Sequence, residues 1–300
     1  MDQQSIKEIV QQYSHEELRD VLQIIGQGYV NDIYIVTTER SKYVVRSDPN
    51  ESTIDRFKKE AWCQVEASKQ GIIVPEVLQL GLKNEHPYML LSHVAGISGQ
   101  DSDKDSQDRI WRKLGEYARK IHFVPASGYG ESMSAPGIFS DSWTRYLDYN
   151  ISSLTRDDKA IGLGVISEQQ SERIKEVFLN LKNARFNLGL THDDLSLKNT
   201  ILTTDDEVCL IDWGSAMVAP VPHVDIAEIL NSSLDQNSRQ FALFLEGYGL
   251  THQDFQEIRV EIDQLNLLIH MDKLRWAIDR KKERIEHFSQ QVKTKLAKVC

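Results

Sequence analysis

Residues 190–214 read L-T-H-D-D-L-S-L-K-N-T-I-L-T-T-D-D-E-V-C-L-I-D-W-G and carry the clearest chemical signal in the chain. Asp194 lies two residues after a histidine, Asn199 follows five residues later, and Asp212 ends a short apolar run. A loop followed by a hairpin can bring these three side chains together. A carboxylate can accept the proton of an acceptor hydroxyl, and an amide oxygen with a second carboxylate suits Mg²⁺ beside nucleotide phosphates. The stretch therefore predicts phosphoryl transfer, which depends on positioning and charge neutralisation.

The residues before this stretch predict a small antiparallel sheet that carries one helix. Short runs rich in β-branched residues are separated by turn residues, as expected of strands. These runs cover residues 21–25, 33–37, 43–46, 77–80 and 88–92. Apolar residues spaced by three and four predict a helix over 54–69.

From about residue 105 the pattern becomes helical, with one island of strand over 200–212. The expected helices cover 106–122, 141–153, 167–183, 224–232, 237–248 and 252–287, the last as two helices. The predicted fold class is α+β: a β-lobe over 1–95, a linker near 92–98 and a larger, mainly helical lobe over 96–300. A cleft between two lobes is a common place for a ligand.

Composition excludes several classes of protein. A net charge of −10 argues against a nucleic-acid partner, whose binding requires a basic face. No apolar run approaches the ~20 residues of a membrane span, and the first residues lack the pattern of a signal peptide. Three scattered cysteines predict neither a disulfide framework nor a zinc site, and they suit a reducing cytoplasm. Residues 97–272 carry 16 basic and 28 acidic groups, a balance that would attract a cationic acceptor.

The stretch 190–214 resembles the catalytic and metal-binding loops of the aminoglycoside phosphotransferase and choline kinase family. That family has the two-lobed fold of the protein kinases. The resemblance implies that Asp194 is the catalytic carboxylate, that Asn199 and Asp212 bind Mg²⁺, and that His192 is structural. Asp193 departs from the family pattern, because glycine usually precedes the catalytic aspartate.

The glycine-containing segment I-I-G-Q-G-Y-V-N-D-I-Y-I-V at 24–36 resembles the family's phosphate-covering loop. Glycines let a backbone approach phosphate oxygens closely and donate N–H groups to them. The resemblance implies nucleotide contacts from Gly26, Gly28 and Asn31. Taken alone, two glycines between strands more often belong to an ordinary hairpin.

Arg46, in Y-V-V-R, stands where protein kinases carry a lysine, and Glu60 on the following helix is its expected ion-pair partner. The resemblance implies that Arg46 binds the nucleotide phosphates, for which its planar fork is suited. Arginine at this place is similar to the hygromycin phosphotransferase branch. Short similarities to that branch also occur at 73–81 and 211–217.

The segment P-Y-M-L-L-S-H-V-A-G at 87–96 resembles the strand that links the lobes of the family. The resemblance implies that the backbone of Ser92 and Val94 binds the adenine edge and that Leu91 lines its pocket. In V-D-I-A-E-I-L, Asp225 matches a structural aspartate of the family.

The function expected from these observations is a small-molecule kinase. It would transfer the γ-phosphoryl group of ATP or GTP, with Mg²⁺, to a hydroxyl of an aminoglycoside or aminocyclitol such as a hygromycin-like antibiotic. Another antibiotic or a metabolite alcohol remains an alternative acceptor, and Asp263, Asp272 and Trp276 are candidates for its pocket. A protein kinase is disfavoured because no long segment ending in A-P-E follows Asp212. A non-catalytic nucleotide-binding module is a third possibility, which Arg46 and Asp193 would fit.

Overall fold

The computed structural model describes residues 1–24 and 32–299, and it begins with a helix that the sequence analysis did not include. Helix α1 (Gln3–Ser14) is capped by Asp2, whose carboxylate accepts a hydrogen bond from the Ser5 amide at 2.7 Å. Ile6, Ile9 and Val10 recur at helical spacing and pack on one face of a sheet. The sheet lobe therefore carries α1 in addition to the single helix expected.

The N-terminal sheet has five antiparallel strands in the order β1-β2-β3-β5-β4, and its predicted strands are confirmed. The strands are β1 (Leu18–Ile24), β2 (Asp32–Thr38), β3 (Lys42–Ser47), β4 (Val77–Lys83) and β5 (His86–Ser92). Arg46 lies opposite Met89 on the face that α2 (Ile54–Lys69) covers, whereas Val45 lies opposite Leu90 and faces α1. Because side chains alternate along a strand, this register points Arg46 toward α2.

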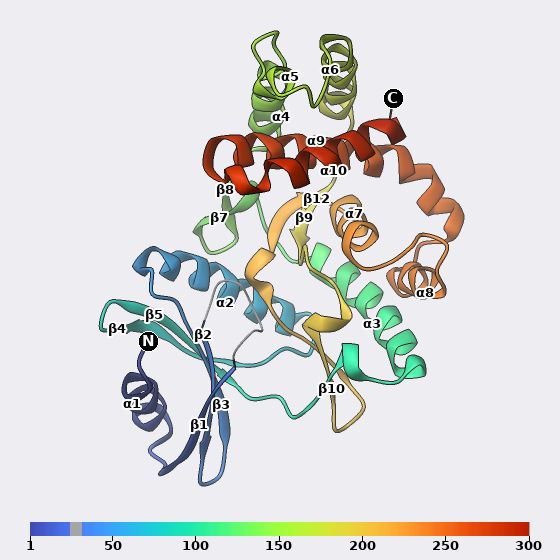
Figure 1. The fold of residues 1–300 in the computed structure, drawn as a ribbon. Helices are drawn as coiled ribbons and strands as arrows, with labels where there is room; N and C mark the ends of the chain where they lie inside the picture. The colour runs from blue at the N-terminus through green and yellow to red at the C-terminus, as the bar shows by residue number, and fades with distance from the viewer. Residues whose placement is uncertain (25–31, 300) are drawn as a thin grey trace.

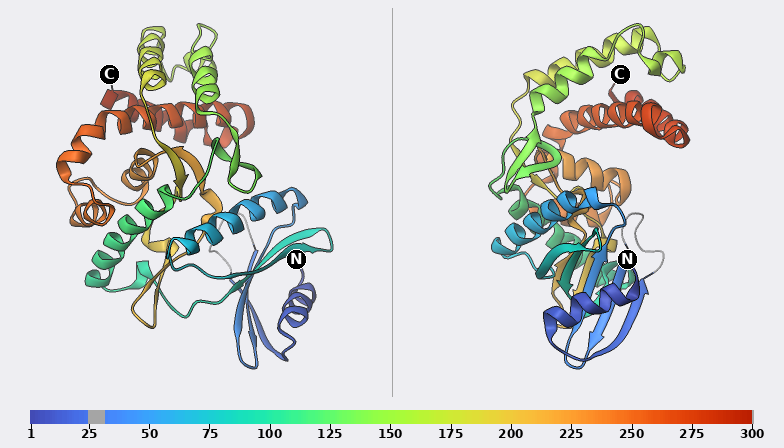
Figure 2. Two further views of the ribbon diagram at one scale, coloured as in Figure 1. Left: turned by 180° about the vertical axis from the view of Figure 1, so that it is seen from behind. Right: turned by 90° about the vertical axis from the view of Figure 1, so that its left-hand side faces the viewer.

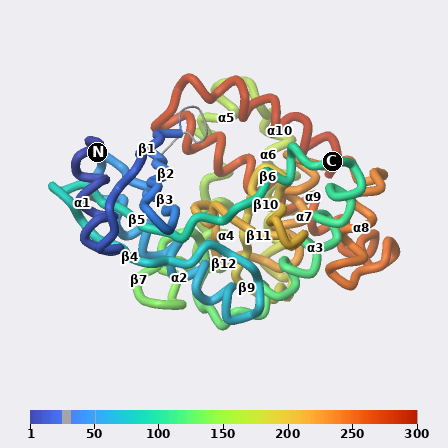
Figure 3. The backbone as a smooth tube through the Cα atoms, turned by 90° about the horizontal axis from the view of Figure 1, so that it is seen from below, coloured from blue at the N-terminus to red at the C-terminus, as the bar shows by residue number. Residues whose placement is uncertain are grey.

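The second lobe is built around helices, and the expected helices are present except over 252–287, where one helix runs to Arg280 and the second continues to Val299. They are α3 (Lys104–His122), α4 (Trp143–Ser152), α6 (Glu168–Asn183), α7 (His223–Ser232), α8 (Arg239–Tyr248), α9 (His252–Arg280) and α10 (Ile285–Val299), with a short α5 (Lys159–Gly162) between α4 and α6. Figures 1 and 3 show α3, α7 and α8 on the opposite side of the molecule from the N-terminal sheet. In Figure 2 the green helices α4 to α6 extend beyond the red α9 and α10, at the end far from that sheet.

Two small sheets lie within the second lobe. One has the order β11-β10-β6, from β6 (Gly96–Ser98), β10 (Thr200–Thr203) and β11 (Val208–Leu210), so the linker itself pairs with the predicted strand island. The other has the order β8-β7-β12-β9, from β7 (Tyr129–Ala135), β8 (Ile138–Asp141), β9 (Leu188–Thr191) and β12 (Met217–Pro220). The expectation of a single strand island is wrong. The second sheet pairs segments that are far apart in the sequence. In the sequence Gly128 and Gly130 suggest a loop rather than a strand, and both have positive φ in the structure.

The main core lies beneath α3, where Trp111, Leu114 and Ile121 are buried together with Trp213. A second cluster joins α4 and α6 to α9 and α10 through Phe178, among others. Cys63 and Cys209 are free and buried, and Cys300 lies outside the described residues. None of the helices within residues 1–24 and 32–299 is long and apolar enough to cross a membrane.

Candidate active site

His192 anchors the loop that follows β9. The side chain is fully buried, its Nε2 lies 3.1 Å from the carbonyl oxygen of Ile211, and its ring meets Trp213 edge-on with 4.8 Å between centroids. Burial lowers the pKa of His192, against the opposing effect of three nearby carboxylates. These are Asp225, Asp194 and Asp212. A neutral ring that donates to a buried carbonyl fits a structural residue, and the carboxylates that the sequence analysis singled out are brought together around it.

A buried chain of hydrogen bonds fixes the turn at Asp193. This residue has φ of 59°, and its backbone N–H donates to Oδ1 of Asp225 at 2.9 Å. The other oxygen of Asp225 lies 2.9 Å from Nε2 of His122, whose Nδ1 lies 2.8 Å from the Tyr248 hydroxyl. Asp225 is only 1% exposed, so it supports the loop from inside the protein and does not reach a substrate.

The loop then closes on itself around Asp194. The side-chain nitrogen of Asn199 donates to the backbone carbonyl oxygen of Asp194 at 2.8 Å. The side-chain oxygen is then the remaining polar atom of the Asn199 side chain. The Asn199 carbonyl in turn accepts from the Ile211 amide at 2.9 Å, and this bond ties the loop to the strand end before Asp212. The Asp194 carboxylate is a quarter exposed, and Nζ of Lys198 lies 3.2 Å from it. Its carboxylate can therefore meet an incoming hydroxyl.

Asp212 begins the turn after β11 in an unusual backbone conformation. Its φ and ψ are 60° and 69°, in the left-handed region that residues with a Cβ rarely adopt. Its side chain is 52% exposed, and Oδ1 lies 3.6 Å from Nη2 of Arg46. The described residues contain no group of three or more His, Cys, Asp or Glu side chains that could hold a metal alone. The donor chemistry still fits Mg²⁺, which is commonly held by one or two carboxylates together with substrate phosphates.

The structure pairs Arg46 with Glu60 on α2. The Glu60 side chain is 1% exposed and that of Arg46 is 12% exposed, so the pair is removed from water. Burial lowers the pKa of Arg46, but the charges of Glu60 and Asp212 outweigh this effect and raise it. The guanidinium therefore stays charged and lies between the carboxylates of α2 and of the Asp212 turn.

The linker offers fewer backbone groups for a nucleotide than the sequence analysis expected. The Ser92 N–H already donates to the Glu76 carbonyl at 2.9 Å, so only the Ser92 carbonyl can meet an adenine edge. The Val94 N–H has no hydrogen-bond partner among the described residues. Leu91 is buried with Met89 on the same face of the sheet as Arg46. Gly26, Gly28 and Asn31 lie outside the described residues.

An aromatic wall with acidic neighbours lies on the helical side of the loop. The Tyr129 ring lies 5.0 Å from that of Tyr146 and 5.2 Å from that of Trp143, measured between centroids. Burial raises the pKa of Tyr129, and the charges of Asp272 and Asp193 raise it further, which places the ring near both carboxylates. The sequence analysis did not single out the two tyrosines: Tyr129 lies in β7, which resembles a loop, and Tyr146 lies within the predicted helix 141–153.

The two other acceptor candidates have partners elsewhere. Asp263 forms an ion pair with Arg259 on its own helix at 2.9 Å, and Trp276 packs edge-on against Phe288 of α10. The structure therefore brings Asp272 to the aromatic wall, pairs Asp263 with Arg259, and leaves Trp276 44% exposed beside Phe288. Glu228 and Lys273, which sequence reasoning also missed, place a negative and a positive charge near Asp193.

We expect Asp193→Asn to stabilise the protein increasingly as the pH rises above the ordinary aspartate pKa of 3.8. Burial raises the pKa of Asp193 well above its ordinary value of 3.8, and the charges of Glu228 and Asp225 add to the effect. The folded state holds the proton of such a carboxyl more tightly than the unfolded state does. The stability that this proton contributes is therefore lost as the pH rises from the unfolded pKa to the folded pKa. Asparagine removes this ionisation and tolerates the positive φ.

The measurement is the difference in melting temperature between variant and wild type across that pH range. Asp206→Asn is the matched control, since Asp206 also has a positive φ, of 62°, but is exposed. A difference for Asp193→Asn that does not change with pH would contradict the raised pKa.

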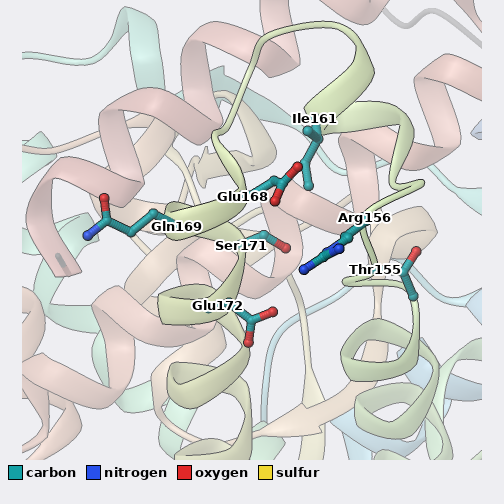
Figure 4. A pocket seen from close by; sticks show the side chains of 7 residues that line it. All are labelled: Thr155, Arg156, Ile161, Glu168, Gln169, Ser171 and Glu172. Carbon is teal, nitrogen blue, oxygen red and sulfur yellow. The ribbon is translucent and has the colours of Figure 1, made fainter.

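Pockets also occur away from this loop. One of about 260 Å³ lies between the end of α4 and the start of α6 (Figure 4). Its lining includes Arg156, Glu168 and Glu172, and none of the candidate site residues. The convergence of the carboxylates around His192 therefore identifies the site better than the pocket does.

Comparison with known proteins agrees with this fold. A search of curated protein sequences finds no match. Among solved structures, the aminoglycoside phosphotransferase APH(4)-Ia is similar over 100% of both chains, with 17% identity and a TM-score of 0.72. The GDP and kanamycin complex of APH(2")-IIia is similar over 99% of both chains, with 16% identity and a TM-score of 0.68.

A putative fructosamine-3-kinase from Haemophilus somnus 129PT is similar over 99% of this chain and 97% of its own, with 14% identity and a TM-score of 0.63. Similarity at such low identity shows the fold, and it confirms the expected protein-kinase-like, two-lobed architecture. The model of the phosphotransferase enzyme family matches residues 21–260. The chain therefore belongs to the phosphotransferase enzyme family.

Proposed function

We propose that the protein transfers the γ-phosphoryl group of ATP or GTP, with Mg²⁺, to a hydroxyl of an aminoglycoside or aminocyclitol. The observation that carries the proposal is the placement of Asp194, Asn199 and Asp212 around one buried histidine, with Arg46 beside Asp212. In this proposal residues 1–95 cover the nucleotide, and residues 96–300 supply the catalytic loop and the acceptor site.

Each residue has a role that its surroundings support. Asp194 orients the acceptor hydroxyl and takes its proton, because its carboxylate is accessible while its backbone is fixed. Asn199 and Asp212 would hold Mg²⁺, which when bound supplies positive charge to neutralise the phosphates. Arg46 binds the nucleotide phosphates through the part of its fork that Glu60 leaves available.

The adenine side of the proposal rests on the linker. The Ser92 carbonyl and the Val94 N–H would bind the base edge, and Leu91 would contact its face. Gly26, Gly28 and Asn31 would cover the phosphates. The buried thiols of Cys63 and Cys209 suit a reducing environment, and we propose that the enzyme acts in the cytoplasm.

The acceptor site favours a cationic molecule with sugar-like rings. Burial raises the pKa of Asp193, Glu228 and Asp272, and an incoming cation would favour their ionised forms beside Asp194. Solved structures of similar fold are described as complexes with hygromycin B and with kanamycin. A metabolite alcohol is the second candidate, because the raised pKa of Asp193 would let a protonated carboxyl donate to a neutral hydroxyl.

The experiment is a turnover assay with ATP and with GTP against a panel of aminoglycosides, aminocyclitols, amino sugars and neutral sugar alcohols. Magnesium-dependent release of the nucleoside diphosphate that requires one class of acceptor would support the proposal. Thermal stabilisation by nucleotide without turnover on any acceptor would instead indicate a binding module and contradict it.

The salt dependence of the acceptor KM separates the two acceptor classes. For a polycationic acceptor we expect KM to rise as salt increases to about 0.5 M, because attraction between exposed charges is screened over a few ångströms at that concentration. The nucleotide KM should change less, since Arg46 is largely buried. An acceptor KM that does not respond to salt would point to the neutral alcohol.

A further inference from the structure

Lys59 is a buried lysine that joins α2 to the turn after Asp212. It precedes Glu60 on α2, and its side chain is 3% exposed. Its Nζ donates to the carbonyl oxygens of Gly214 and Ala216, both at 2.7 Å. In Figure 1 the blue helix α2 runs beside the gold segment that leads into β12. A helix of the sheet lobe is thus bonded to the turn that begins with Asp212.

These bonds act on a turn that needs external support. The left-handed conformation of Asp212 is unfavourable for a residue with a Cβ, and such conformations persist where the surrounding structure holds them. Hydrogen bonds from an ammonium group are stronger than those between neutral groups. An ammonium removed from water also needs such partners, and the two carbonyls supply them. Removing Lys59 would therefore free the carbonyl groups of the turn, on the side away from the Asp212 carboxylate.

The neighbouring residue of α2 restrains the other side of the same turn. Glu60 pairs with Arg46, whose Nη2 lies 3.6 Å from Asp212 Oδ1. The approach is close enough that a Cβ on Gly214 would lie 3.4 Å from Asp212 Oδ1 and 3.9 Å from Glu60 Oε2. Two consecutive residues of one helix thus restrain the carbonyls and the carboxylate of a single turn.

We infer that Lys59 is a positioning residue that holds the Asp212 turn in its metal-binding conformation and couples that turn to α2. The inference rests on the proposed function in so far as Asp212 is the metal ligand. Its role resembles that of the outer residues that orient the ligands of a metal site. Lys59 touches neither nucleotide nor acceptor in this account, because its ammonium is used by backbone carbonyls.

The test compares Lys59→Met, Lys59→Gln and Lys59→Arg with the wild-type protein. The first readout is hydrogen exchange of the amides at 213–217 in the nucleotide-free protein, which we expect to be faster in Lys59→Met. The second is the Mg²⁺ concentration for half-maximal nucleotide-induced thermal stabilisation. We expect this concentration to rise about 10–100-fold, the range typical of residues that orient metal ligands. Lys59→Arg keeps a charged donor, so its exchange rate and its Mg²⁺ requirement should lie between those of Lys59→Met and the wild type.

Lys295→Met is the matched control. Lys295 is also buried, at 8% exposed, but it donates to Asn231 between α7 and α10. Its loss should lower stability without changing exchange at 213–217 or the Mg²⁺ dependence. Lys59→Gln keeps a neutral N–H donor and gives a reading if Lys59→Met does not fold.

Two results would overturn the inference. One is unchanged exchange and Mg²⁺ dependence in folded Lys59 variants, and the other is an equal change in Lys295→Met, which would indicate general loosening. A wild-type protein that binds no nucleotide with Mg²⁺ would refute the proposed function, whereas the exchange experiment would still decide whether Lys59 holds the turn.

Discussion

Asp194→Asn is expected to lower kcat by about 10²–10⁴-fold, the usual cost of losing a positioned general base. The fold should survive, because the hydrogen bonds that shape the loop do not use this carboxylate. They run from the Asp193 N–H to Asp225, from the Asn199 side chain to the Asp194 carbonyl, and from the Ile211 N–H to the Asn199 carbonyl. Asparagine keeps the size of the side chain and removes only its basicity and charge.

The measurement is kcat with whichever acceptor the turnover panel identifies, together with the melting temperature and nucleotide affinity. Asp206→Asn is the control for the chemical change, since Asp206 lies on the hairpin between β10 and β11 and forms an exposed ion pair with Arg109 of α3. A folded Asp194→Asn protein with nearly the wild-type kcat would show that another group accepts the proton. Loss of nucleotide binding in the same variant would show that Asp194 acts before the chemical step.

The loop from Asp194 to Asp212 was predictable because its geometry is local. Asn199 closes on the carbonyl of Asp194 only five residues away, and a short hairpin then returns the chain to Asp212. The N-terminal strands were predictable for a similar reason, since sequential hairpins bring Arg46 to the face that α2 covers. The pairing of Arg46 with Glu60 then requires one helix placed on that face.

Contacts between distant segments could not be predicted in this way. Lys59 bonds to carbonyls 155 and 157 residues further along the chain, and nothing in F-K-K-E distinguishes it from the exposed Lys58. Tyr129 belongs to a strand that pairs with β12, far along the sequence. Periodicity describes how one element is buried, and it gives no information on which remote loop meets that element.

The region proposed as the acceptor site shows the same limit for charge. The acidic balance of 97–272 indicated a negative surface, yet individual carboxylates have different roles. Asp263 is neutralised by Arg259, Asp225 is buried as a support, and Asp272 lies near the aromatic wall. A formal charge count cannot separate a carboxylate that faces a ligand from one that an internal donor has already engaged.

Arg46→Ala is expected to reduce the free energy of unfolding by about 3–5 kcal/mol, the range observed when one partner of a buried ion pair is removed. The reason is Glu60, which is 1% exposed and would keep a charge without its partner. Nucleotide affinity should fall by about 10–100-fold in addition, since a hydrogen bond to a charged group contributes about 1.5–3 kcal/mol. Stability and binding therefore have to be separated.

The double variant Arg46→Ala/Glu60→Gln separates them. Removing the buried charge of Glu60 should restore much of the lost stability, because the remaining amide costs less to bury than a carboxylate. It should restore no nucleotide affinity, since the guanidinium that we propose binds the phosphates is still absent. Arg46→Lys should fall between the two, because a lysine offers a point charge in place of a planar fork. Chemical denaturation and nucleotide titration of these variants measure the two effects independently. Wild-type nucleotide affinity in the double variant would show that Arg46 only balances Glu60 and Asp212, and that the phosphates are bound elsewhere.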